Sequence, residues 1–61
     1  MRDYYFRVNF LLGCPMIILT GGKRSAKILA QAEAIISGRD RRVTLIERIS
    51  DEEGKAHAKT T

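Results

Sequence analysis

The segment Tyr4–Phe10 constrains the fold most, because its side chains alternate between a strongly apolar set and a more polar set. One side of a strand at these positions carries Tyr4, Phe6, Val8 and Phe10, and the other carries Tyr5, Arg7 and Asn9. A period of two, with aromatic and β-branched residues, is typical of a strand that has one buried face. The segment therefore predicts a strand whose phenylalanines face the core.

Two further segments have strand character. Met16–Thr20 is a short apolar run between a proline and two glycines, which predicts the second strand of a hairpin. Residues 41–50 predict a third strand, with Val43 and Leu45 on one side and Thr44, Ile46 and Arg48 on the other. Glu47 would lie on the side of Val43, so we expect the strand to leave the core there or to contain a bulge.

Residues 25–37 change to the helical period of 3.6. Five apolar residues form one stripe of this helix, namely Ile28, Leu29, Ala32, Ile35 and Ile36. Ser25 is the expected N-cap and Gly38 the expected left-handed residue after the helix. Alanines favour the helix and allow its backbone to lie close to a sheet. The expected solvent side of this helix comprises Lys27, Ala30, Gln31 and Ala34.

The order strand, strand, helix, strand predicts a small α+β protein, with a single ββαβ domain over residues 1–50. A right-handed crossover after the helix favours a three-stranded antiparallel sheet of order 2-1-3, with the helix packed on one face. The alternative order, 1-2-3, requires a parallel pair at the edge. Residues 51–61 contain no large apolar side chain, which predicts a polar, flexible C-terminal tail.

Size and composition argue against catalysis and cofactors. A chain of 61 residues has room for one small core, which rarely supplies more than about 3–5 kcal/mol without help from a second copy or a cross-link. The single cysteine, Cys14, cannot close an intrachain disulfide, and with the single histidine, His57, it is too few for a zinc site. No carboxylate pair or nucleophile–base pattern is present. We therefore expect a non-enzymatic protein without a metal or cofactor, and a homo-oligomer.

The location that we expect is cytoplasmic, without membrane contact. The apolar run over residues 10–19 is too short to cross a bilayer and contains Pro15. A lone thiol is compatible with a reducing compartment.

Basic residues are concentrated between positions 21 and 42 of this basic chain, whose net charge is +4. The candidate phosphate or nucleic-acid contacts are Gly22, Lys23, Arg24, Lys27, Arg39, Arg41 and Arg42. Glycines and a lysine before a helix can hold a phosphate, but the spacing does not match a nucleotide-binding loop. A plain turn and a solvated basic face are the alternatives. Any nucleic-acid binding is therefore expected to be weak.

The side of the sheet that the helix leaves uncovered has a surplus of apolar residues. The candidate protein-interaction residues there are Tyr5, Arg7, Ile17, Ile46 and Arg48. Exposed apolar patches commonly mark contacts with other chains. The leading hypothesis is a non-catalytic protein-interaction module, of the kind that phages and mobile elements use as regulators or inhibitors, which occupies a partner's surface. The alternative is a basic nucleic-acid binder that contacts phosphates through Lys23, Arg24, Arg41 and Arg42.

Overall fold

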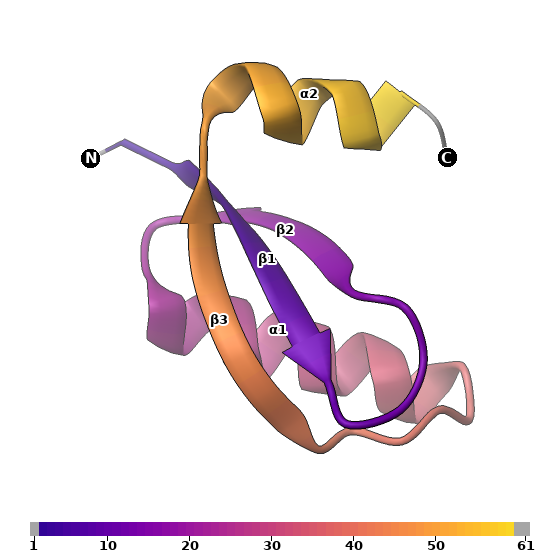
Figure 1. Cartoon of the computed structure of the whole chain (residues 1–61). Coiled ribbons are helices and arrows are strands. Elements are labelled where there is room, and N and C mark those ends of the chain that lie inside the picture. The colour runs from indigo at the N-terminus through magenta and orange to yellow at the C-terminus, as the bar shows by residue number, and fades with distance from the viewer. Residues whose placement is uncertain (1, 60–61) are drawn as a thin grey trace.

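The structure is a computed structural model that describes residues 2–59, with side chains to position 57. Its elements are β1 (Tyr4–Phe10), β2 (Met16–Thr20), α1 (Lys23–Ile36), β3 (Val43–Ile49) and α2 (Asp51–Lys59). The strands form an antiparallel sheet of order β2-β1-β3, which confirms the predicted α+β class and strand order. Figure 1 shows α1 running behind the sheet, whereas α2 lies at the end of the sheet where β1 begins and β3 ends.

The core lies between β1 and α1. Phe6, Val8 and Phe10 of β1 are buried, and Val8 is the largest side chain that is fully enclosed. The partly buried side chains packed around them are Tyr4, Met16, Ile18, Val43 and Ile46. The predicted core side of β1 is therefore confirmed.

The two ends of α1 have different capping. The helix begins earlier than expected, because Gly22 in an extended conformation is the N-cap and its carbonyl accepts the N–H of Ala26 at 3.0 Å. The prediction that Ser25 is the N-cap is wrong. At the other end Gly38 has φ +73°, and the Arg39 N–H donates to the Ala34 carbonyl at 2.8 Å. This is the left-handed glycine cap that the sequence predicts.

A bulge near the start of β3 changes which residues face the core. Phe10 pairs with Val43 and Asn9 pairs with Leu45, so Thr44 is the extra residue. Its hydroxyl donates to the Asn9 carbonyl at 3.3 Å. The irregularity is thus at Thr44 and not at Glu47, and it places Val43 and Ile46 on the same side. The predicted alternation along 41–50 is wrong because one extra residue reverses it.

The segment predicted to be a flexible tail forms the helix α2 instead. Its first turn contains Asp51, Glu52 and Glu53, whose negative charge favours a helix N-terminus. The Ser50 hydroxyl accepts the Glu53 N–H at 3.1 Å, which satisfies one of the free donors of that turn. Residues 60–61 of the predicted tail lie outside the described part of the chain.

Candidate functional site

The side of α1 that faces the sheet is made of alanines. Ala26, Ala30 and Ala34, each four residues apart, are completely buried. They share one core cluster with Phe6, Val8 and Phe10 of β1, and their small side chains allow the helix backbone to lie close to these larger ones. The expectation that Ala30 and Ala34 lie on the solvent side is therefore wrong.

The large aliphatic side chains of α1 point away from the sheet. Their exposed fractions are 60% for Ile28, 48% for Leu29, 55% for Ile35 and 80% for Ile36. At about 100° per residue, Ala32 in the middle of this stripe is about 200° around the helix from Ala30. We call the side formed by residues 28, 29, 32, 35 and 36 the α1 outer face. It is an exposed apolar surface on a well-defined helix, which sequence reasoning assigned to the core.

The other side of the sheet is partly covered by α2. Gly54 of α2 is buried, and a Cβ atom built on it would be 2.1 Å from Tyr5 Cγ. Ile49 pairs with Tyr5 across the sheet and is also buried. Leu19 and Leu45 on this side remain about half exposed. The predicted interaction surface on this face is therefore smaller than expected, because Tyr5 packs against α2, which forms where a flexible tail was predicted.

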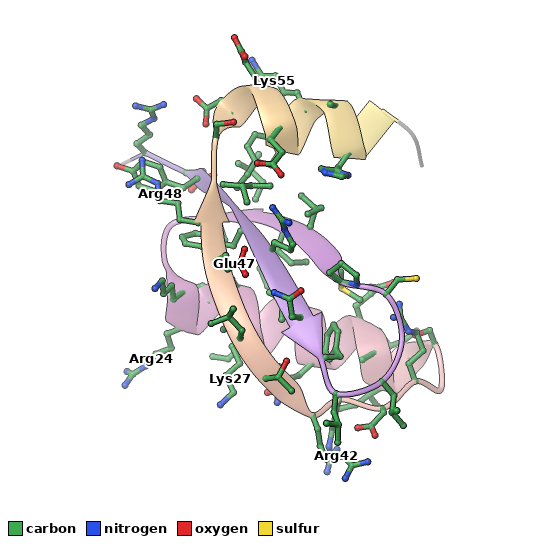
Figure 2. All side chains as sticks on the ribbon, viewed as in Figure 1. Arg24, Lys27, Arg42, Glu47, Arg48 and Lys55 are labelled. Carbon is green, nitrogen blue, oxygen red and sulfur yellow. The ribbon has the colours of Figure 1, made fainter. Side chains whose placement is uncertain are left out.

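Arg7 connects the sheet to α2. Its guanidinium donates to Glu53 Oε1 at 2.7 Å, and its Nε lies 4.0 Å from Glu47 Oε2 on β3. Only 30% of the Arg7 side chain is exposed. Glu53 Oε1 is also 4.0 Å from His57 Nε2. The Arg7 guanidinium thus pairs with carboxylates of the protein itself. Figure 2 shows Glu47 over the middle of the sheet.

The remaining predicted interaction residues are divided between the two faces of the sheet. Ile17 pairs with Arg7 and is half-buried on the α2 side. Ile46 pairs with Val8 and packs against the core on the α1 side. Arg48 is on the α1 side as well, with its guanidinium carbon 3.7 Å from the centre of the Tyr4 ring. The expected grouping of Ile46 and Arg48 with Tyr5 is wrong, because the bulge at Thr44 reverses the facing of β3.

The basic residues near the start of α1 are open to solvent. Gly22, the N-cap, is followed by the exposed Lys23, Arg24 and Lys27. Within residues 2–59, none of these three cations takes part in an ion pair. In Figure 2 the Arg24 and Lys27 side chains project away from the ribbon.

The basic residues after α1 are partly engaged with the protein itself. The Arg39 guanidinium donates to the Cys14 carbonyl at 2.8 Å. Arg42 forms several hydrogen bonds to the Asp40 carboxylate, and these bonds lower the pKa of Asp40 from 3.8 to about 2. Arg41 is exposed, and its carbonyl accepts from the Gln31 side chain at 3.1 Å. The predicted phosphate contacts therefore form two groups, one at each end of a helix of 14 residues, which is about 21 Å long.

Other kinds of site have little support in the part of the chain that the structure describes. Across residues 2–59, no cluster of three or more His, Cys, Asp or Glu side chains could hold a metal ion. Neither described helix has the length and apolar character needed to cross a membrane. Cys14 is exposed in the loop between β1 and β2.

No protein-family model matches the sequence, and no curated protein or solved structure matches it. The α1 outer face and the two basic groups are therefore interpreted from their own geometry and chemistry.

Proposed function

We propose that the protein is a non-catalytic interaction module that binds a protein surface through the α1 outer face. The observation that carries this proposal is the orientation of α1, which buries three alanines and exposes four large aliphatic side chains. Contiguous apolar patches of this kind on small proteins commonly mark protein contacts. The proposal keeps the predicted class of function and moves the contact from the sheet to the helix.

Energetic considerations agree with a binding role for this face. A fully buried Leu or Ile side chain contributes about 1.5–3 kcal/mol relative to an exposed one. The four side chains of the outer face are about half to four-fifths exposed, so the monomer does not realise most of this gain. A partner that covers them would gain roughly 1–2 kcal/mol from each. Binding of this kind covers a surface of the partner and needs no chemical step.

Affinity capture tests the proposal. The tagged chain and two variants, Ile28→Glu and Ile36→Glu, are compared for partners that remain bound after nuclease treatment. The matched control is Leu45→Glu, which changes an exposed leucine on the opposite side of the sheet. We expect both α1 variants to lose the captured protein and the control to retain it. Equal capture by all four chains would contradict the proposal.

Nucleic-acid binding is a second candidate, favoured by one observation. Lys23, Arg24, Lys27 and Arg41 are exposed and have no ion-pair partner within residues 2–59. Phosphates attract such groups without sequence preference. Between the two basic groups, however, α1 presents aliphatic side chains, which do not form hydrogen bonds with base edges. This candidate therefore corresponds to weak backbone contact.

A further inference from the structure

The polar residues beside the α1 outer face are unevenly distributed around the helix. At about 100° per residue, Arg24, Gln31 and Lys27 lie about 80°, 100° and 140° to one side of the centre of the stripe. The Gln31 side chain donates to the Arg41 carbonyl at 3.1 Å, which brings residue 41 to the same side. Glu33 lies about 100° to the other side. The cations are therefore gathered along one edge of the apolar stripe.

We call Arg24, Lys27 and Arg41 the basic flank. All three side chains are exposed, and none forms an ion pair within residues 2–59. Figure 2 shows the Arg24 and Lys27 side chains projecting to the same side of the ribbon. Arg42, by contrast, already binds the Asp40 carboxylate. The basic flank is thus open to carboxylates of another molecule.

We propose that the α1 outer face binds an acidic amphipathic helix of a partner protein, whose carboxylates lie toward the basic flank. This inference rests on the proposed function, because it uses the same face and names the chemistry of the partner. The stripe is about 12 Å long from Ile28 to Ile36 and about 120° wide, a surface that one helix covers at an axis separation of about 8–10 Å. Ala32 at its centre is small, so a larger side chain of the partner helix packs there.

The aliphatic side chains and the cations have different roles in this contact. Burial of the four large aliphatic side chains supplies the affinity, which ions do not screen. The basic flank selects among apolar surfaces, because complementary charge mainly sets specificity and orientation. Glu33 on the opposite side disfavours a second row of carboxylates. We therefore expect the partner helix to be acidic along one edge.

The same arrangement disfavours a nucleic acid or a lipid surface as the occupant. A phosphate backbone would pair with the basic flank and leave the aliphatic stripe in water. A helix that lies on an anionic membrane carries Lys and Arg on its polar face. On α1 the side opposite the stripe is buried against the sheet at Ala30, and Glu33 would lie beside the lipid phosphates. A protein with carboxylates beside an apolar surface matches both parts of the face.

A displayed peptide library tests the chemistry of the partner. Its members are helical peptides whose fixed leucines recur every three and four residues. Their flanking positions vary among Glu, Gln and Lys, which have similar helix propensities, so that the library varies only in charge. Selection on the unmodified chain at low salt should enrich Glu at these positions. Enrichment of Lys, or no preference, would overturn the proposal.

A charge-reversed chain provides the matched selection, with Arg24→Glu, Lys27→Glu and Arg41→Glu combined. The fold should persist, because Arg24→Glu places an acid in a first turn that has none and the Gln31 hydrogen bond uses the backbone of residue 41. This chain should enrich Lys where the unmodified chain enriches Glu. Lys55→Glu, which reverses an exposed cation on α2, is the control and should keep the preference for Glu. An unchanged preference in the reversed chain would contradict the proposal.

Binding of one selected acidic peptide measures the two contributions separately. The unmodified chain should bind it at least about threefold more tightly than the same peptide with Gln in place of Glu, because several exposed ion pairs act together. At about 0.5 M salt this difference should shrink. A chain with both Ile28→Ala and Ile36→Ala should lose affinity for the two peptides equally, because these substitutions change no charge.

The outcomes separate this inference from the proposed function. Peptides that bind through Ile28 and Ile36 without a charge preference overturn the inference and leave the proposed function standing. A library that yields no binder also overturns it, and loss of a captured protein in Ile36→Glu then supports the proposed function alone. If the chain binds anionic phospholipid vesicles through the same face more tightly than any selected peptide, a lipid surface is the occupant and the inference is wrong.

Discussion

Gly54 of α2 lies directly on the ring of Tyr5 of β1, with no room between them for a methyl group. A Cβ atom on Gly54 would be 2.1 Å from Cγ, 2.4 Å from Cδ1 and 2.6 Å from Cβ of the tyrosine. A rotation about χ1 of Tyr5 could move Cγ and Cδ1, but Cβ is attached to the backbone and would stay 2.6 Å away. The glycine therefore holds α2 against the sheet, although glycine is unfavourable within a helix.

The first prediction is that Gly54→Ala separates α2 from the sheet. The added methyl group should cost about 2–3 kcal/mol of stability, the upper part of the usual range for overpacking because it overlaps three atoms of Tyr5, and this exceeds the gain of roughly 1 kcal/mol in helix propensity. Thermal unfolding and hydrogen exchange at Tyr5 measure the effect. Lys55→Ala, at the exposed neighbouring position, is the control and should be nearly neutral. Unchanged stability in Gly54→Ala would show that α2 does not pack on Tyr5.

A second prediction concerns removal of α2. A chain that ends at Ser50 exposes Tyr5 and Ile49 and leaves Arg7 without Glu53. We expect a loss of roughly 1–3 kcal/mol, from partial re-exposure of two large side chains. For a domain of this size, each kcal/mol lowers the Tm by about 4–8 °C. An unchanged Tm in a melting experiment would support the flexible tail that the sequence pattern indicates.

The third prediction is that the pKa of Asp40 depends on Arg42. The folded pKa of about 2 is below the ordinary 3.8, because Arg42 donates hydrogen bonds to the ionised carboxylate. The resulting stabilisation is complete above pH 3.8 and is lost as the pH falls through about 2. In an NMR titration, Arg42→Gln should raise the Asp40 midpoint towards 3.8, whereas Arg41→Gln should leave it unchanged. Equal midpoints in all three chains would contradict the assignment.

A fourth prediction concerns Gly38, which follows α1 with φ +73°. A side chain would meet no atom within 4 Å there, so the cost of Gly38→Ala is conformational and should be about 1–2 kcal/mol. Gly21→Ala is the matched control, because Gly21 does not have a positive φ and its Cβ would make only an ordinary contact at 3.9 Å. In chemical denaturation, Gly38→Ala should therefore lose about 1–2 kcal/mol of unfolding free energy, and Gly21→Ala should lose much less.

The strands could be predicted because each has a local signal. Tyr4–Phe10 alternates with one strongly apolar side, and Met16–Thr20 lies between turn residues. Periodicity alone could not predict which side of α1 faces the sheet, because two stripes of side chains on this helix have the helical period. One contains Ile28, Leu29, Ile35 and Ile36 and the other Ala26, Ala30 and Ala34, and hydropathy alone favours the first. The choice depends on which stripe packs against Phe6 and Phe10 of the sheet, which is a tertiary property.

The helix α2 had a local signal that composition concealed. Ser50 followed three residues later by Glu53 is the beginning of a capping box, and the Ser50 hydroxyl indeed accepts the Glu53 N–H. The absence of large apolar residues nevertheless favoured a flexible segment. What holds α2 in place is the fit of Gly54 over Tyr5 and the ion pair between Arg7 and Glu53. These contacts join residues about 46–49 positions apart, so no local pattern reveals them.

The last prediction tests the nucleic-acid alternative through its salt dependence. Each phosphate that a cation neutralises contributes about −0.9 to the slope of log K against log salt for duplex DNA. We expect weak binding without sequence preference, with a dissociation constant of about 10⁻⁴–10⁻⁶ M, because the α1 face between the basic groups is aliphatic. Replacement of Lys23, Arg24, Lys27 and Arg41 by Ser should abolish it. Arg42 is retained in this variant because it pairs with Asp40.

Two comparisons make this test decisive. Lys55→Ser, which removes an exposed cation from α2, should change the slope little. A protein contact through the aliphatic α1 outer face should not weaken with salt in this way, because the burial of apolar side chains is not screened by ions. A chain that retains its captured protein at about 0.5 M salt while its DNA binding disappears behaves as an interaction module with a solvated basic surface. Tight, sequence-selective binding that persists at this salt concentration would instead establish nucleic acid as the partner.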